Sequence, residues 1–355
     1  MNPLRVAVIG AGHLGRIHTR LAAARQDIEL LGIVEPQAAT RDKVCAEFNV
    51  RGFADVREII DQLDAAIVVT PTKYHHDVTR PLLERGIACF VEKPITFSLD
   101  DADELIALAR ASDVVLQVGH VERFNPALTA ARAHLQSPRY LEAARTSTYT
   151  FRSIDIGVVL DLMIHDIDIA LSLADSEVVD VRAFGMPVFG PHEDIAQARL
   201  EFANGCVANL MASRTSIVAQ RTLHAISGDG YALLDLGNRQ AKVVQISEHL
   251  KRGELDVNRA TPEEVATIKE RLFSDYLPLT ELAVPEANAI ADEQTDFFTA
   301  IRTQRDPIVT GEQGRAALEV AYRVLDAIQH PQQHRVLPLP QRSLDPLAGV
   351  TRKAG

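Results

Sequence analysis

The chain has 355 residues, of which 46% are hydrophobic and 24% are charged, and its formal net charge is −11. This length allows two domains of ordinary size, each with its own hydrophobic core. The acidic balance disfavours non-specific binding to nucleic acid or to an anionic membrane surface. No apolar stretch is long enough to span a bilayer, and glycines interrupt the short apolar run near the N-terminus. We therefore expect a cytoplasmic protein without a signal peptide.

The three cysteines, Cys45, Cys89 and Cys206, lie far apart and form no C-x-x-C motif. Such spacing is typical of small buried side chains in a reducing compartment, which agrees with a cytoplasmic location.

An apolar strand over residues 5–9 leads directly into Gly10, Gly12 and Gly15, and a helical pattern follows over 16–24. In a G-x-G-x-x-G motif the first glycine allows a tight turn, the second lets the backbone approach a pyrophosphate, and the third allows close packing of helix on strand. The free N–H groups at the start of the helix then face the phosphates. A glycine-rich turn in another α/β protein is the alternative, but the strand–turn–helix context favours a dinucleotide site.

We place His13 and Leu14, which lie between the last two glycines, in the same cofactor loop. A second strand over residues 28–34 ends at Glu35, where the fold places the group that binds a ribose. A carboxylate there accepts hydrogen bonds from a 2′-hydroxyl and repels a 2′-phosphate, so NAD is favoured over NADP. The nearest cation, Arg41, is expected on the next helix, and a solvated loop acid is the alternative interpretation of Glu35.

Strands and helices alternate over residues 1–121. The predicted strands cover residues 5–9, 28–34, 51–54, 65–70, 88–92 and 114–118. The predicted helices cover residues 17–24, 40–48, 56–62, 77–85 and 100–111. This alternation predicts an α/β domain of the Rossmann type, with a doubly wound parallel sheet between two layers of helices.

The pattern changes over residues 122–330. A buried helix is predicted over residues 157–174, followed by strands over 178–184, 196–203, 207–213, 222–227, 231–236 and 242–247. Asn204-Gly205 lies between two of these strands and predicts a two-residue hairpin turn. Two late helices are predicted over 287–303 and 312–329, the stretch 252–282 stays undetermined, and 331–355 is predicted to be a Pro-rich C-terminal tail. Together these elements predict a second α/β domain with a large, mainly antiparallel open sheet.

Glu92, Lys93 and Pro94 follow the strand over residues 88–92. The carboxyl ends of the strands in a doubly wound sheet line the ligand crevice. A lysine there can hydrogen-bond a reacting hydroxyl, stabilise a developing alkoxide, or act as a base. Pro94 fixes the direction of the chain, and a cis peptide bond before it would aim Lys93. A surface lysine after an edge strand is the alternative, and the residues alone leave both interpretations open.

Three ionisable residues, Asp161, His165 and Asp168, share one face of the apolar helix over residues 157–174. Unpaired charge inside a buried helix is costly, so these residues need a reason to be there. Asp161 could hold His165 in one tautomer and leave its second ring nitrogen free to accept a proton. A structural His–Asp pair is the alternative. No metal site is predicted, because no second histidine lies nearby in the sequence and no thiolate spacing is present.

Two further stretches hold candidates. Thr70, Pro71 and His75 follow a strand and are expected to line the cofactor site, although His75 or its neighbour His76 could equally cap the next helix. Arg123, just after the last strand of the first half, could bind an anion such as a diphosphate or be structural.

These motifs together resemble the glucose–fructose oxidoreductase / inositol dehydrogenase family of NAD(P)-dependent sugar oxidoreductases. The resemblance extends from Leu4 to about Gln329 and is carried by the glycines, the TPTKYHH stretch, Glu-Lys-Pro and the D-x-x-x-H helix. It implies an NAD-binding domain over 1–121, a substrate-binding and oligomerisation domain over 122–330, and dimers or tetramers. The family's catalytic residues match Lys93, Asp161 and His165, and its histidine after the Thr-Pro pair matches His75. The predicted cofactor contacts are thus Gly10, Gly12, His13, Leu14, Gly15, Glu35, Thr70, Pro71, His75, Glu92 and Lys93.

Within this family, the stretches 119–126 and 161–166 are similar to the branch that oxidises UDP-N-acetylglucosamine at C3. That similarity implies substrate contacts by Arg123, Asn125 and His165, and transfer of the keto sugar to an aminotransferase in lipid A-type glycolipid biosynthesis. A UDP-N-acetylglucosaminuronate 3-dehydrogenase, an inositol dehydrogenase, a 3-ketosugar reductase and a non-catalytic NAD-sensing protein are the alternatives. The chain departs from the family at residue 35, where Asp is common and Glu alters the reach of the carboxylate.

Overall fold

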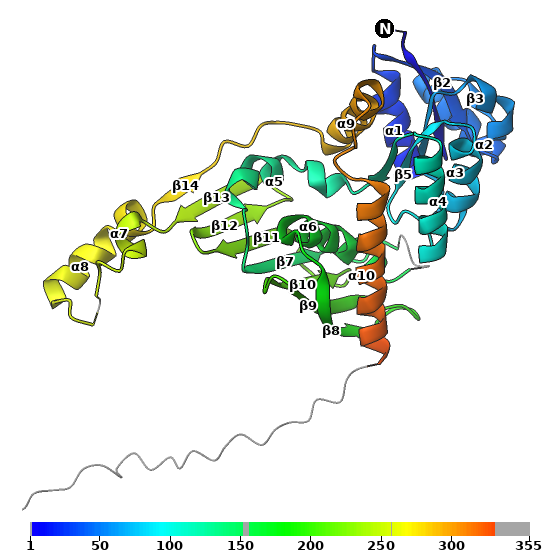
Figure 1. The fold of residues 1–355 in the computed structure, drawn as a ribbon. Helices are drawn as coiled ribbons and strands as arrows, with labels where there is room; N and C mark the ends of the chain where they lie inside the picture. Colours follow the sequence, from blue (N-terminus) through cyan, green and yellow to red (C-terminus); the bar gives the residue numbers. More distant parts are fainter. Residues whose placement is uncertain (1, 152–155, 257, 331–355) are drawn as a thin grey trace, which may run out of the picture.

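The computed structural model describes residues 2–151, 156–256 and 258–330. Two sheets form the framework, and the second lies beside the first along the molecule (Figure 1). The predicted tail over 331–355 lies outside the described residues.

The first sheet has six parallel strands in the order β3-β2-β1-β4-β5-β6, which confirms the predicted doubly wound fold. Its strands are β1 (Leu4–Ile9), β2 (Ile28–Val34), β3 (Gly52–Phe53), β4 (Ala65–Val68), β5 (Ala88–Glu92) and β6 (Leu116–Gly119). Its helices are α1 (His13–Ala23), α2 (Ala38–Phe48), α3 (His75–Leu83) and α4 (Leu99–Ala111). Every residue of β4 and β5 is buried, which explains why these strands are continuous apolar runs instead of alternating ones.

One helix predicted in this part is absent. Residues 56–62 form two short 3₁₀ turns, η1 (Val56–Glu58) and η2 (Ile60–Gln62), instead. Asp55 and Glu58 close a capping box around the first turn, and Ile59 then leaves the helical region with φ −134°. The box stabilises the first turn, and the φ of Ile59 ends that turn before a continuous helix can form.

A helix from the end of the chain, α9 (Ala289–Thr303), packs on the first sheet and lies next to α1 (Figure 1). Phe297 and Phe298 are fully buried there, and the ring of Phe297 lies 6.0 Å from that of Phe90 on β5, centroid to centroid. The boundary predicted from the sequence assigned this helix to the second domain. The sheet face needs a third cover beside α1 and α2, and no helix within 1–121 supplies it.

The second sheet has eight strands in the order β14-β13-β12-β11-β7-β10-β9-β8, and among the described strands only the β7–β10 pairing is parallel. This confirms the predicted, mainly antiparallel sheet. Its strands are β7 (Tyr140–Thr146), β8 (Val178–Met186), β9 (Ile195–Phe202), β10 (Val207–Ser213), β11 (Gln220–Ser227), β12 (Gly230–Asp235), β13 (Gln240–Gln245) and β14 (Leu279–Glu281). A turn that contains Asn204 and Gly205 joins β9 to β10, with Gly205 at φ 85°. The predicted two-residue turn is wrong, because Phe202 bonds Cys206 and a three-residue loop, 203–205, lies between them. β7 and β14 were not predicted.

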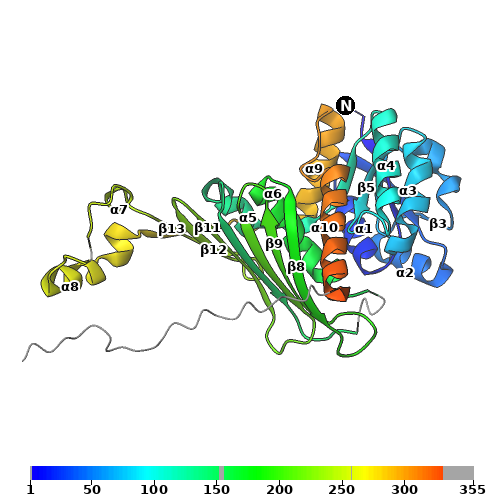
Figure 2. The same cartoon turned by 60° about the horizontal axis from the view of Figure 1, so that its bottom comes forward.

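Helices cover one face of the second sheet and leave the other open (Figure 2). They are α5 (Pro126–Ala131), α6 (Ile164–Ala174) and α10 (Gly311–Gln329), together with the short turns η4 (Val121–Phe124), η5 (Arg132–His134) and the π-helical turn η6 (Val159–Met163). Because α10 also packs against α4, it ties the two halves together.

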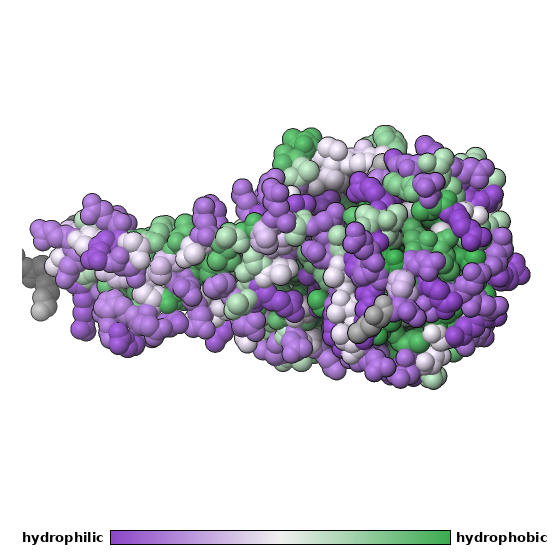
Figure 3. Space-filling view, turned by 90° about the horizontal axis from the view of Figure 1, so that it is seen from above, coloured by the Kyte–Doolittle hydropathy of each residue, from purple (hydrophilic) through white to green (hydrophobic). Residues whose placement is uncertain are grey.

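Most of the stretch left undetermined from the sequence, 252–282, forms a narrow projection together with the helix just before it. It contains α7 (Glu248–Lys251), α8 (Pro262–Glu270) and η7 (Leu272–Tyr276) and extends away from the body beyond β13 (Figures 1 and 3). Hydrophilic residues cover most of its visible surface (Figure 3). Within the ranges described, none of the helices combines the length and apolarity that a bilayer crossing requires.

The packing of α9 predicts a large effect for Phe297→Ala. Loss of this fully buried ring should lower the free energy of unfolding by about 3–5 kcal/mol, measured by denaturant titration. Phe273→Ala is the control, since that ring is 54% exposed on the projection. Equal small effects of the two substitutions would contradict the assignment of α9 to the first core.

Candidate active site

The three glycines of the N-terminal loop differ in whether the surrounding structure would accommodate a side chain. Gly10 has φ +107°, and a Cβ there would lie 2.7 Å from the carbonyl oxygen of Val69. A Cβ on Gly15 would lie 2.1 Å from the carbonyl oxygen of Gly10. A Cβ on Gly12 meets nothing within 4 Å, so folding alone does not require glycine there.

Gly12 is also the N-cap of α1, and no side chain caps the helix. The first N–H groups of α1 are therefore available for an anion, and His13 and Leu14 begin the helix at this point. Open space at Gly12, next to an uncapped helix, fits the approach of a pyrophosphate.

Glu35 lies against this loop. Its carboxylate accepts hydrogen bonds from the backbone N–H of Ala11, at 3.1 Å, and of Gln37, at 3.0 Å. Arg41 lies on α2 as expected and donates to the main-chain oxygen of Glu35, at 2.9 Å, without contacting its carboxylate. Glu35 is thus a half-buried acid held at the cofactor loop, and ribose binding by its carboxylate stays a prediction.

His75 connects two walls of the predicted cofactor site. Its Nδ1 lies 2.9 Å from the carbonyl oxygen of Pro94, and its Nε2 lies 2.8 Å from that of Thr70. Burial lowers the pKa of His75. The ring therefore ties the end of β4, where Pro71 follows, to the loop after Lys93. Contact of His75 itself with the cofactor stays a prediction, whereas the buried Oγ1 of Thr70 has no partner and can accept one.

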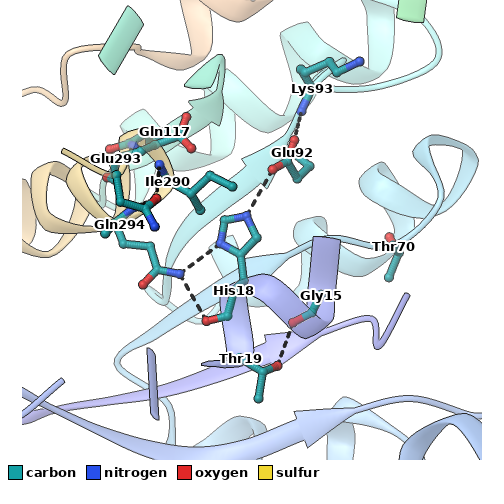
Figure 4. Close-up of polar contacts among 12 residues, drawn as sticks. Gly15, His18, Thr19, Thr70, Glu92, Lys93, Gln117, Ile290, Glu293 and Gln294 are labelled. Carbon is teal, nitrogen blue, oxygen red and sulfur yellow. Dashed lines mark hydrogen bonds and ion pairs between the residues drawn. The ribbon is translucent and has the colours of Figure 1, made fainter. Parts of the chain in front are cut away.

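Behind Lys93, a buried hydrogen-bond network joins α1, β5 and α9 (Figure 4). His18 donates from Nε2 to the Glu92 carboxylate at 3.1 Å, and Gln294 donates to its Nδ1 at 3.0 Å. The second carboxylate oxygen of Glu92 accepts from the backbone N–H of Lys93 at 3.1 Å. Burial alone would raise the pKa of Glu92, but His18 and Lys93 lower it. These contacts position the backbone of Lys93, and a cofactor contact by Glu92 stays a prediction.

Lys93 reaches across to the second domain. Its ammonium donates to the carbonyl oxygen of Asp161 at 2.7 Å and lies 3.4 Å from the Asp161 carboxylate. The Lys93–Pro94 peptide bond is cis, as considered from the sequence. Because only 13% of its side chain is exposed, the alternative of a surface lysine is wrong.

The predicted pairing of Asp161 with His165 is wrong. Among the residues that the structure describes, no hydrogen bond joins the two side chains, and the Asp161 carboxylate faces Lys93. The physical reason is the π-helical turn η6, in which a wider turn changes the angle between residues four apart. Asp168, the third ionisable residue predicted on this face, pairs with Arg123 at 3.3 Å.

His165 is the second residue of α6 and lies in a partly buried position near Lys93. Burial, followed by the positive charges of Lys93 and Arg145, lowers the pKa of His165 well below its ordinary value of 6.5. The ring is therefore neutral at pH 7 and able to accept a proton.

A second histidine lies beside it. The ring of His120, at the end of β6, contacts that of His165 edge to face, with centroids 6.3 Å apart. This neighbour was not predicted from the sequence, because His120 and His165 are 45 positions apart and only the fold brings them together. Across the described residues, no group of three His, Cys, Asp or Glu side chains is arranged to hold a metal ion.

A buried ion cluster that the sequence did not reveal holds α6 in place. Arg145 on β7 bonds both oxygens of Asp166 on α6, at 3.0 and 2.7 Å, and reaches Glu122 on η4 at 2.7 Å. Burial alone would lower the pKa of Arg145, but the two carboxylates raise it. Since Asp166 follows His165, this cluster fixes the position of the imidazole.

Arg123 and Asn125 were predicted to contact substrate, but their contacts lie within the protein. Arg123 is buried and bonds Asp168 and the carbonyl oxygen of Ile308, each at 3.3 Å. Asn125 caps α5 and donates to Glu122 at 2.9 Å and to the carbonyl oxygen of Leu236 at 3.0 Å. Both residues therefore have contacts within the protein, and contact of either with substrate stays a prediction.

The first half of the molecule defines a class, that of NAD-binding oxidoreductases. Residues 4–120 match the "Oxidoreductase family, NAD-binding Rossmann fold", and residues 127–232 match the "GFO/IDH/MocA C-terminal domain". A UDP-N-acetylglucosamine 3-dehydrogenase from Acidithiobacillus ferrooxidans is 35% identical over 327 residues, covering 92% of this chain and 97% of that protein. Its crystal structure superposes with a TM-score of 0.81 at 34% identity, over 93% of this chain and 99% of that chain. A scyllo-inositol 2-dehydrogenase (NAD(+)) from Bacillus subtilis is 30% identical, covering 92% of this chain and 94% of that protein.

The chain belongs to the GFO/IDH/MocA family. It is an NAD-dependent oxidoreductase, and the residues at the glycine loop and at Glu35 fit that cofactor.

Two glycine substitutions separate cofactor binding from folding. Gly12→Ala should leave the thermal unfolding midpoint near that of the wild type and weaken NAD binding, because its methyl group enters open space that the pyrophosphate needs. Gly15→Ala should lower the midpoint, because its methyl group meets the Gly10 carbonyl. Calorimetric titration with NAD and thermal unfolding check the pair; tight NAD binding by the Gly12 variant would refute the placement of the pyrophosphate.

The lowered pKa of His165 predicts the pH dependence of catalysis. A neutral ring is the form that accepts a proton, so kcat/KM should stay level as the pH falls to 6.5 and decline only below that value. A pH profile of initial rates at saturating NAD measures this. An acid limb centred at or above pH 6.5 would exclude His165 as the titrating base.

Proposed function

We propose that this enzyme oxidises the C3 hydroxyl of a nucleotide sugar, UDP-N-acetylglucosamine, to the 3-keto sugar. The observation that carries the proposal is the meeting of Lys93, from the first domain, with the α6 region of the second, next to His165. The 35% identity to a UDP-N-acetylglucosamine 3-dehydrogenase over nearly the whole chain supports the substrate.

The proposed mechanism divides the work between an ammonium and an imidazole. Bound NAD would supply the acceptor for the hydride that leaves the carbinol carbon. His165, neutral and half-buried, accepts the hydroxyl proton. Lys93 donates a hydrogen bond to the same oxygen and stabilises the charge that develops on it. Asp161 positions Lys93 through its carbonyl oxygen and its carboxylate.

The positive charge of Lys93 has two effects that suit this chemistry. It favours an alkoxide-like oxygen, and together with burial, the larger cause, it lowers the pKa of His165 so that the ring is unprotonated before the substrate arrives. His165 is therefore in its proton-accepting form, and the Lys93 ammonium helps the substrate oxygen to lose its proton.

A related substrate is the second candidate, because the scyllo-inositol 2-dehydrogenase is also 30% identical over nearly the whole chain. A uronate form of the same nucleotide sugar and a 3-ketosugar reductase remain further alternatives. A non-catalytic NAD sensor is disfavoured by the contacts of Lys93 described above.

The cellular context is proposed in the same way. We place the enzyme in the cytoplasm, upstream of an aminotransferase that converts the keto sugar into a 3-amino sugar for lipid A-type glycolipids. We also propose a homodimer or homotetramer. The open face of the second sheet supports this, since it exposes Phe184, Met186 and Met211 between polar residues.

The experiment is a panel of UDP-N-acetylglucosamine, its uronate, UDP-glucose and inositols, each tested for NADH formation. UDP-N-acetylglucosamine should give the highest kcat/KM, and mass spectrometry of the product should show loss of two hydrogens. Preference for an inositol would replace this proposal by the second candidate.

His165→Asn and Lys93→Met should each lower kcat by about 10²–10⁴-fold, as expected for loss of a positioned proton acceptor or of charge stabilisation. NAD affinity, measured by calorimetry, should change little. His134→Asn, at an exposed histidine of η5, is the matched control and should retain wild-type turnover. Near-normal turnover by either site variant would refute its assigned role.

A further inference from the structure

Several buried polar atoms without partners lie in one region of the domain interface. They are His165 Nδ1, both ring nitrogens of His120, Asp168 Oδ2 and Arg123 Nε. A buried polar group without a hydrogen bond is costly, and such groups usually contact ordered water. The clustering of these unpartnered atoms around His165 therefore requires an explanation.

The fold arranges these groups in order. His165 and Asp168 lie three residues apart on α6 and therefore share one side of the helix. His120 contacts His165 edge to face at 6.3 Å and precedes η4, the turn that carries Arg123. Arg123 bonds Asp168 at 3.3 Å. The sequence of groups is thus imidazole, imidazole and carboxylate, the last of these paired with a guanidinium.

This arrangement ends at a cavity. Asp168 and Arg123 line a space of about 680 Å³ that is separate from the glycine loop. Its other lining residues include exposed positions, Arg132, Gln136 and Ser137, so the cavity opens to solvent. Buried polar groups therefore occupy the region between the proposed active site and bulk water.

We propose that His120 is a relay residue that carries the substrate proton from His165, through water, to Asp168 and out through this cavity. The inference rests on the proposed function, because it takes His165 as the base. It adds an exit path for the proton through a cavity whose lining includes neither the glycine loop nor Lys93 nor His165.

The atoms balance over one turnover. The carbinol C–H bond breaks with its electron pair passing to NAD, the O–H bond breaks, and C=O forms. The hydroxyl proton moves to His165. It then passes to His120, to the Asp168 carboxylate and to water in the cavity, which returns both imidazoles to their neutral forms. No other oxidant or reductant is needed.

The charges around His120 suit transient protonation. Burial lowers the pKa of His120, and Lys93 and Arg123 act in the same direction, whereas Asp168 and Glu92 oppose them. The ring is therefore neutral at rest, and the acidic neighbours favour a proton moving through it. A buried neutral histidine with a purely structural role would instead satisfy both nitrogens by fixed hydrogen bonds, as His18 does with Glu92 and Gln294.

The test compares His120→Phe with His134→Phe on whichever sugar of the panel the wild type oxidises. Phenylalanine keeps the ring against His165 and removes both nitrogens, and His134 is the matched exposed control. The measurements are kcat, NAD affinity, the solvent deuterium isotope effect on kcat, and rescue by added imidazole. His120→Gln is a second variant that keeps a polar side chain without a titratable ring.

For both His120 variants we expect kcat to fall between about tenfold and 100-fold, less than for loss of the direct base. NAD affinity and the unfolding midpoint should stay near those of the wild type, the isotope effect should increase, and imidazole should restore part of the rate. Unchanged kcat and isotope effect in both variants would overturn the relay while leaving the proposed function intact. A lower kcat with no change in isotope effect and no rescue would also overturn it, since that is the result of a structural role. Lack of wild-type turnover on every sugar would reject the proposed function and the relay together.

Discussion

The contact between the Lys93 ammonium and Asp161 is the interaction on which the account depends, because it places the end of a Rossmann strand against a helix of another domain. Neighbouring hydrogen bonds hold Lys93 in position for this contact. The Glu92 carboxylate accepts from the backbone N–H of Lys93 and is itself bonded by His18. His75 lies within hydrogen-bond distance of Pro94, in the loop after Lys93. On the other side, the Arg145 cluster holds α6. The site is therefore fixed from both domains before any ligand binds.

This arrangement buries several charged side chains, which costs free energy of desolvation. Pairing opposite charges offsets part of that cost. Breaking one partner from a buried pair typically costs about 3–5 kcal/mol, because the remaining charge is left uncompensated. Arg145, Asp166, Arg123 and Asp168 are all buried and all paired. These pairs fix η4, β7 and α6 in one arrangement, which gives the interface a specific geometry that apolar packing alone would not define.

The sequence predicted the parts that depend on local pattern. The glycine motif, the strand that ends at Glu92, and the apolar helix with His165 were all visible, because each has a periodicity or spacing of its own. Contacts between distant segments were not visible. His120, Arg145 and α9 reach their partners only through the fold, and nothing near them in the sequence indicates the partner. Asp161 shows a different failure, since a π-helical turn changed the face on which a residue predicted from α-helical spacing would lie.

The most direct measurement of the central claim is a crystal structure of the protein with NAD and UDP-N-acetylglucosamine bound together. The account predicts that the C3 hydroxyl lies within hydrogen-bond distance of both the Lys93 ammonium and a ring nitrogen of His165, with C3 facing C4 of the nicotinamide. A complex in which that oxygen contacts neither side chain, or in which another sugar carbon faces the nicotinamide, would contradict it.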